Sequence, residues 1–230
     1  MSGVDLDEEV RRVDPDRWFA SRFIADPSAR ADVIALYAFD HHLARVETAA
    51  SSPLGAQIRL TWWREAIEEI FAGGVIRRHP AVEALAKAIR TKSLPQAPFD
   101  ALFESRLGSL EATPMDLAHA LAWAQGAHGQ LACLAAMSLG EPGGAENAVA
   151  AGTTWGLTRL RRSGRVSGHA LDRQIRETLN EARRASRRLR ATSFPAALPA
   201  TLAGAELARG SPSDLEKRVR LAWAVLSGRL

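Results

Sequence analysis

One periodic segment constrains the fold class of this chain more than any other. Within residues 53–73, large apolar side chains recur at the i, i+3, i+7 and i+11 positions: Leu60, Trp63, Ile67 and Phe71. This spacing places them on one face of an α-helix. A proline opens the segment and a Gly-Gly pair closes it, as is typical of helix starts and ends. The segment therefore predicts an amphipathic helix that buries a wide apolar stripe.

The same helical period continues along the rest of the chain, between breaks rich in Pro, Gly and Ser. Helices are predicted to begin at Asp14-Pro15 and at Asp26-Pro27, the second running to about Ala49. Later helices are predicted over residues 80–90, 99–110, 116–139, 145–162 and 169–190, and a loop at Pro195 and Pro199 precedes a short helix. The last helix follows Ser213 and is expected to bury Val219, Leu221, Trp223 and Leu226.

No segment shows sustained period-two alternation, so no strands are predicted. We expect an all-α fold, a single-domain helical bundle of about ten helices. Residues 1–13 are polar and are expected to form a flexible N-terminus, with residues 14–230 forming the domain.

Composition narrows the class of protein. The chain has 230 residues, 47% of them hydrophobic, with a formal charge of +4 and one cysteine, Cys133. One cysteine excludes a disulfide framework and a cysteine-only metal site. No apolar run approaches the ~20 residues that a membrane-spanning helix needs, and the acidic N-terminus does not match a signal peptide. We expect a cytoplasmic protein, with peripheral contact to an inner membrane left open.

Four residues share one face of the predicted helix that precedes the Ser-Ser-Pro break. They are spaced i, i+4, i+7 and i+8: Asp40, Ala44, Glu47 and Thr48. Asp40 and Glu47 lie two turns apart, about 10 Å along the axis at 1.5 Å per residue, so one metal ion cannot bind both.

The segment between residues 36 and 80 resembles the squalene/phytoene synthase family. The residues that carry the resemblance are L-Y-A-F at 36–39, I-R-L at 58–60, W-W-R at 62–64 and H-P at 79–80, with a weaker G-A-H-G at 126–129. The resemblance implies an isoprenoid-synthase-like helical bundle. It also implies two Asp-rich faces that bind Mg²⁺ and diphosphate across a central cavity.

Both Asp-rich patterns depart from the family at this chain's matching positions. The first aligns with Ala44, Arg45 and Thr48, and the second with residues 158–166, where Arg162 and Val166 replace carboxylates. The chain therefore resembles a non-catalytic branch of the family, the group of a mitochondrial complex I assembly factor and its bacterial relatives. This resemblance predicts a pseudoenzyme without catalytic or metal-binding residues, acting as an assembly factor or a binder of lipid or protein.

Two other functions stay open. The chain could be a prenyl-diphosphate transferase of isoprenoid biosynthesis with atypical Mg²⁺ ligation, or an inactive structural partner of a true synthase. For any of these functions the candidate pocket and ligand-binding residues are Tyr37, Asp40, Glu47, Arg59, Trp62, Arg64 and His128. Trp62 could line a prenyl or lipid cavity or pack on a neighbouring helix, and Arg59 and Arg64 could bind diphosphate or pair with nearby glutamates.

The second half carries a strong positive charge. Between Arg159 and Arg190 there are eleven arginines against three carboxylates, Asp172, Glu177 and Glu181. This bias fits a solvated helix face, and it also fits an anionic membrane surface or an acidic protein partner. Nucleic acid is disfavoured because no aromatic residues alternate with the arginines. The candidate surface residues are Arg183, Arg184, Arg187 and Arg188.

Overall fold

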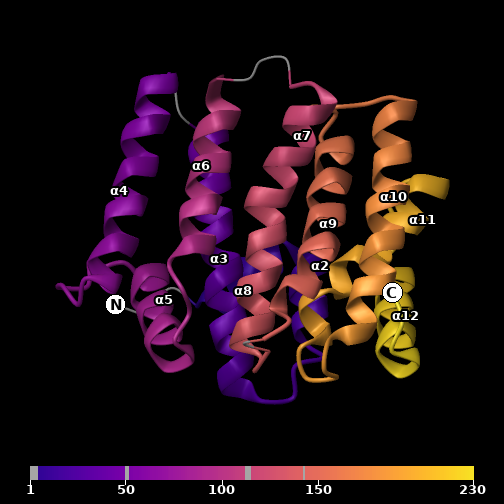
Figure 1. Ribbon diagram of the computed structural model, residues 1–230, viewed down its shortest axis with the longest axis horizontal. Coiled ribbons are helices and arrows are strands. Elements are labelled where there is room, and N and C mark those ends of the chain that lie inside the picture. The colour runs from indigo at the N-terminus through magenta and orange to yellow at the C-terminus, as the bar shows by residue number, and fades with distance from the viewer. Residues whose placement is uncertain (1–4, 50–51, 112–114, 142) are drawn as a thin grey trace.

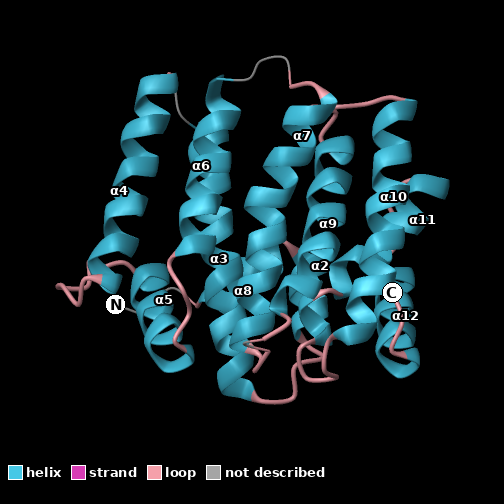
Figure 2. Ribbon diagram, viewed as in Figure 1, coloured by secondary structure: helices cyan, strands magenta, loops and turns pink. Residues whose placement is uncertain are grey.

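The computed structural model describes residues 5–49, 52–111, 115–141 and 143–230, and the side chains of residues 47–49 and 111 lie outside the description. Every regular element in these residues is helical (Figure 2), as the sequence predicts. In chain order the α-helices are α1 (Leu6–Val13), α2 (Pro15–Ser21), α3 (Pro27–Ala49), α4 (Pro53–Phe71), α5 (Pro80–Lys92), α6 (Ala97–Glu111), α7 (Leu117–Ala124), α8 (Gln130–Ser138), α9 (Val149–Arg162), α10 (His169–Ala185), α11 (Ala203–Arg209) and α12 (Asp214–Ser227).

Side-chain caps fix the helix starts that the sequence predicts. Asp14 Oδ1 accepts from the backbone N–H of Arg17 at 3.2 Å at the start of α2. Asp26 accepts from two backbone N–H groups at 3.0 and 3.2 Å before α3. His79, Asp116 and Ser213 cap α5, α7 and α12 in the same way. These caps satisfy N–H groups that have no partner within the helix.

The long helices form a bundle around α3. Figure 1 shows α4, α6, α7–α8, α9 and α10 running side by side across the molecule, with α3 behind them. Phe39 of α3 is completely buried, and its ring lies 5.7 Å from that of Trp63 on α4 and 5.8 Å from that of Phe103 on α6. Aromatic pairs at these spacings stabilise the contact beyond the area they bury.

The glycines near residue 128 lie at a helix distortion and at a close contact between helices. Residues Gln125–Gly129 form a π turn that joins α7 to α8. On the facing helix α9, a Cβ atom added at Gly152 would lie 2.1 Å from the carbonyl oxygen of His128, closer than atoms can approach. Glycine at this position therefore lets α9 press against the π turn and fixes the place of His128.

Three segments differ from the sequence-based expectation. Residues 6–13, expected to be flexible, form α1, because Val10 is completely buried and the helix packs on α3. The expected loop around Pro195 and Pro199 consists of buried 3₁₀ turns at Phe194–Ala196 and Leu198–Leu202.

The third difference concerns α12. Of its four residues expected to be buried, only Leu221 is, whereas Val219, Trp223 and Leu226 are 60%, 70% and 82% exposed. The neighbouring 3₁₀ turns pack against the side of α12 that carries Leu221 and Ala224. The apolar side chains on the other side of the helix therefore face solvent.

Candidate functional site: a buried ion network

A carboxylate from α3 lies between two arginines in the middle of the bundle. Asp40 is 1% exposed. Its Oδ2 accepts from a guanidinium nitrogen of Arg17 on α2 at 2.6 Å, and its Oδ1 accepts from Arg106 on α6 at 2.5 Å. Burial by itself raises the pKa of Asp40, but the charges of the two arginines outweigh it and hold that pKa well below its usual range. Asp40 is therefore ionised and tied to both neighbouring helices.

The network continues from Arg17 to a second carboxylate. The Nε of Arg17 donates to Asp14 Oδ2 at 2.6 Å, and Arg159 on α9 donates to the same oxygen at 2.9 Å. Burial opposes ionisation of Asp14, yet Arg17 and Arg159 still lower its pKa. Two buried carboxylates and their arginines thus connect α2, α3, α6 and α9.

The aromatic side chains of Trp123 on α7 and His128 in the π turn lie next to this network. His128 is 4% exposed, and its Nδ1 lies 3.8 Å from Asp40 Oδ2, beyond hydrogen-bond distance. Burial lowers the pKa of His128 to about 3, so the imidazole is neutral at physiological pH. The ring of Trp123 lies edge-on to His128, with 4.9 Å between centroids. Neither His128 Nδ1 nor Trp123 Nε1 has a hydrogen-bond partner in the described part of the chain.

Tyr37, one turn before Asp40 on α3, packs beneath the guanidinium of Arg17 at 4.9 Å. Burial raises the pKa of this tyrosine to about 12, so its hydroxyl stays protonated. The structure thus brings together three of the candidates predicted from sequence, Tyr37, Asp40 and His128.

A small cavity of 170 Å³ adjoins this network, and Asp40, Ala44, Arg106, His128 and Arg159 are among its lining residues. Small-molecule sites usually occupy roughly 300–1,000 Å³. Because both oxygens of Asp40 are held by guanidinium groups, this carboxylate offers no free oxygen to Mg²⁺. Among the residues that the structure describes, no three His, Cys, Asp or Glu side chains are grouped as metal ligands. The described residues therefore do not fit a Mg²⁺ site.

The other pocket candidates lie elsewhere. Arg59 is exposed on α4, and Arg64 forms an ion pair with Glu104 on α6. Trp62 is 38% exposed and contacts Trp63, His79 and Arg77. None of these three lines the cavity beside Asp40. The side chain of Glu47 lies outside the described residues.

Arg162, which aligns with the second family pattern, belongs to a separate ion network. It donates to Glu206 of α11 at 2.6 and 2.8 Å and to Asp16 of α2 at 3.1 Å. Asp16 in turn pairs with Lys217 of α12 at 2.8 Å. The hydrogen bonds that Arg162 donates to Glu206 are the main cause that raises the pKa of Arg162. The ion pairs of Arg162 and Asp16 thus connect four helices, α9, α11, α2 and α12.

Sequence reasoning missed Arg17 and Arg106. Arg106 follows Phe99 and Leu102 at helical i+7 and i+4 spacing, which places it on the buried stripe of α6. An arginine at a core position implies a buried carboxylate partner, so this signal was readable. Arg17 has no comparable pattern, because α2 is only seven residues long.

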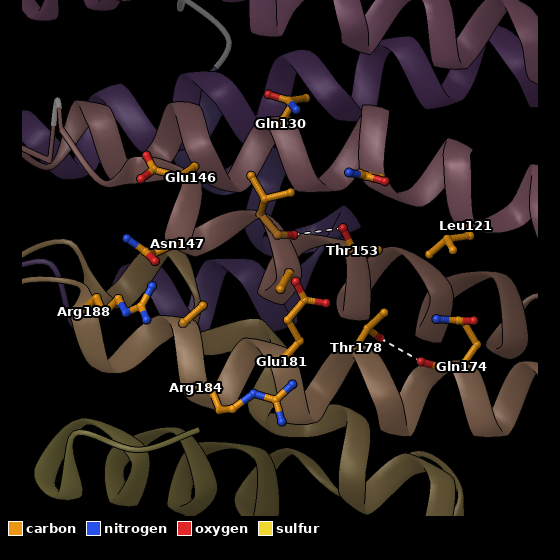
Figure 3. A pocket seen from close by; sticks show the side chains of 14 residues that line it. Leu121, Gln130, Glu146, Asn147, Thr153, Gln174, Thr178, Glu181, Arg184 and Arg188 are labelled. Atoms are coloured by element: carbon orange, nitrogen blue, oxygen red, sulfur yellow. Dashed lines mark hydrogen bonds between the residues drawn. The ribbon is translucent and has the colours of Figure 1, made fainter.

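A larger hollow of 710 Å³ lies between α9, α10 and the two helices α7 and α8 that the π turn joins. Figure 3 shows its lining, where the hydroxyls of Thr153 and Thr178 donate to carbonyl oxygens of their own helices at 2.9 and 3.0 Å. Arg184 and Arg188 line this hollow, whereas Arg183 lines a different one beside α12. Arg187 is exposed, and a membrane or partner surface formed by these four arginines stays a prediction.

No helix in the described residues is long and apolar enough to cross a membrane.

Comparison with solved structures defines the fold. The chain superimposes on a dehydrosqualene synthase crystallised with a ligand with a TM-score of 0.74 at 13% identity, covering 97% of this chain and 94% of the other. It also matches squalene synthase HpnC from Alicyclobacillus acidocaldarius, with a TM-score of 0.69 at 14% identity, covering 97% and 92%. The fold is thus the all-helical isoprenoid synthase fold.

Sequence comparison then gives the family. The squalene/phytoene synthase family model matches residues 10–166. The chain belongs to the squalene/phytoene synthase family. It is also 28% identical over 99 residues to a complex I assembly factor 6 homologue from Dictyostelium discoideum. That match covers 43% of this chain and 28% of the longer relative.

Proposed function

We propose that this protein is a non-catalytic member of its family, which binds protein or lipid in the assembly of a respiratory membrane complex. The single observation that carries the proposal is the pairing of Asp40 with Arg17 and Arg106, at 2.6 and 2.5 Å. A carboxylate in this setting stabilises the bundle and is unavailable to a divalent ion. The residues of the two Asp-rich patterns support the same reading, since Ala44, Arg45 and Arg162 stand where the family resemblance implies metal ligands.

Electrostatics favours this proposal over a prenyl-diphosphate transferase. A Mg²⁺-diphosphate site needs several carboxylates that face one cavity. Here the cavity beside Asp40 is lined by Arg17, Arg106, Arg159 and Arg165 together with two carboxylates that already have arginine partners. Its volume of 170 Å³ is also small for two prenyl chains.

The role in assembly rests on the relative from Dictyostelium, whose name is that of a complex I assembly factor. A lipid held by the fold belongs to the same proposal.

The enzymatic alternative is tested with the purified chain. We would incubate it with farnesyl and geranylgeranyl diphosphate and with Mg²⁺ or Mn²⁺, and measure release of inorganic diphosphate against a blank without protein. We expect no release above the blank. Metal-dependent release that disappears in Glu47→Gln, but persists in the exposed control Glu177→Gln, would overturn the non-catalytic proposal.

The assembly role is tested in the organism of origin. Deletion of the gene is expected to lower the amount of assembled complex I on native gels, and the wild-type gene is expected to restore it. Glu47→Gln should restore it equally, because an assembly factor does not use this carboxylate as a metal ligand. An unchanged level of complex I after deletion would refute this partner while leaving the diphosphate assay to decide the question of catalysis.

A further inference from the structure

The last helix presents an apolar stripe to solvent. Along α12 the exposed members are spaced i, i+4, i+8 and i+11: Leu215, Val219, Trp223 and Leu226, at 73%, 60%, 70% and 82% exposure. The opposite side of the helix, with Leu221 and Ala224, packs against the bundle. Figure 1 shows α12 at the edge of the molecule, where it contacts α2 and the 3₁₀ turn at Leu198–Leu202. These four exposed side chains follow one another at one-turn spacing, so they form an apolar stripe along one side of α12.

A hollow of 740 Å³ runs beside this stripe, and its remaining lining is rich in arginine. Arg183 of α10 lies on its wall, where its Nε donates to the carbonyl oxygen of Leu230 at 3.3 Å. Arg220 and Arg229 belong to the same wall, and Arg220 pairs with Glu216 at 2.8 Å. Apolar side chains and guanidinium groups thus meet along one groove.

The charge around the groove has one dominant sign. Three arginines line the groove, Arg183, Arg220 and Arg229, against one carboxylate, Glu216. The surface is therefore complementary to a negatively charged, partly apolar partner.

We propose that α12 docks the protein onto an anionic phospholipid bilayer. In this arrangement Trp223 and its apolar neighbours enter the boundary between headgroups and acyl chains, while Arg183 and Arg229 contact lipid phosphates. An amphipathic helix with a tryptophan on its apolar face and arginines beside it has the composition of helices that lie in this interface. The inference concerns a surface remote from Asp40, so it stands whether or not the protein is catalytic.

A second copy of the chain explains the surface less well. A helix of 14 residues is about 21 Å long at 1.5 Å per residue, so a stripe about 10 Å wide offers about 200 Å². A stable protein interface buries about 800 Å² on each partner. A bilayer has no such minimum area, because the arginines add electrostatic attraction to apolar insertion.

Flotation with vesicles tests the proposal on the full chain. We expect binding to vesicles of phosphatidylcholine mixed with phosphatidylglycerol, weak binding to phosphatidylcholine alone, and loss of binding as salt is raised. The variant Trp223→Ser with Leu226→Ser should lower the partition coefficient by about tenfold or more, because it removes apolar groups that insert. Its matched control is Leu54→Ser with Ile58→Ser on α4, two positions that are 66% and 63% exposed.

The charge contribution is tested separately. Arg183→Glu with Arg229→Glu should weaken binding to anionic vesicles, whereas Arg173→Glu with Arg176→Glu, two exposed arginines of α10 outside the groove, should have a smaller effect. Circular dichroism would confirm that each variant is folded. The proposal is overturned if the serine variant of α12 and its α4 control float equally. It is also overturned if sedimentation velocity reveals a dimer that the α12 variant dissociates while wild type does not float.

Discussion

The buried carboxylate of Asp40 makes the sharpest prediction of this structure. Replacing it in Asp40→Ala leaves the guanidinium groups of Arg17 and Arg106 in the bundle without their shared acceptor. Arg17 and Arg106 side chains are only 4% and 2% exposed, so water cannot take over the role of the carboxylate. Removing one partner of a buried ion pair typically costs about 3–5 kcal/mol. We expect a loss of this size in the free energy of unfolding.

Urea unfolding followed by circular dichroism would measure the loss, with the dependence on denaturant checked for an unchanged slope. Glu177→Gln, at an exposed position of α10, is the control and should change stability by less than about 0.5 kcal/mol. The double variant Asp40→Leu with Arg106→Met should recover part of the loss, because Arg17 then still pairs with Asp14. A loss below about 1 kcal/mol for Asp40→Ala would refute the view that this network holds the bundle together.

Three further predictions concern the surroundings of this network. Since burial lowers the pKa of His128 to about 3, against about 6.5 in an unfolded chain, the unfolded state takes up the proton first and stability falls as pH drops from about 6.5 to 3. The contribution of His128 to the fall should reach about 2 kcal/mol at pH 5, so the fall in His128→Gln should be smaller by that amount, as measured by urea unfolding at each pH. Gly152→Ala should lower the free energy of unfolding by about 1–3 kcal/mol, because the added Cβ would clash with the π turn. Gly143→Ala, at a position with open space around it, should leave it unchanged, and the melting temperatures of the two variants would show the difference. Arg162→Met should lower the free energy of unfolding by about 1–2 kcal/mol, because it leaves the buried carboxylate of Glu206 without its arginine partner. The loss is smaller than for Asp40 because the side chain of Arg162 is partly exposed to solvent.

Much of the fold was predictable because its signals are local. Capping residues such as Asp14, Asp26 and Ser213 mark helix starts because each accepts a hydrogen bond from a backbone N–H three residues later. Prolines mark helix starts because their fixed φ suits the first helical turn. The apolar stripe of α4 likewise depends only on helical periodicity, and Leu60, Trp63 and Ile67 are buried as expected.

What the sequence could not give is which apolar face meets the bundle. The stripe of α12 is as periodic as that of α4, yet Val219, Trp223 and Leu226 face solvent because the adjacent 3₁₀ turns occupy its other side. The same holds for the candidate site. Tyr37, Asp40 and His128 were recognisable, but the partners of Asp40 come from helices distant in sequence, and no local pattern identifies Arg17.

The spacing of the network along the chain has a consequence for biosynthesis. Arg17 and Asp40 are 23 residues apart, Asp40 and Arg106 are 66 apart, and Asp14 and Arg159 are 145 apart. On the ribosome, Asp14 and Asp40 therefore emerge long before Arg159 does. Their carboxylates must remain hydrated until their arginine partners have been synthesised. Contacts of such long range form late and slow the final step of folding. The N-terminal half is therefore expected to leave the exit tunnel as a loosely packed intermediate that requires α9 for completion.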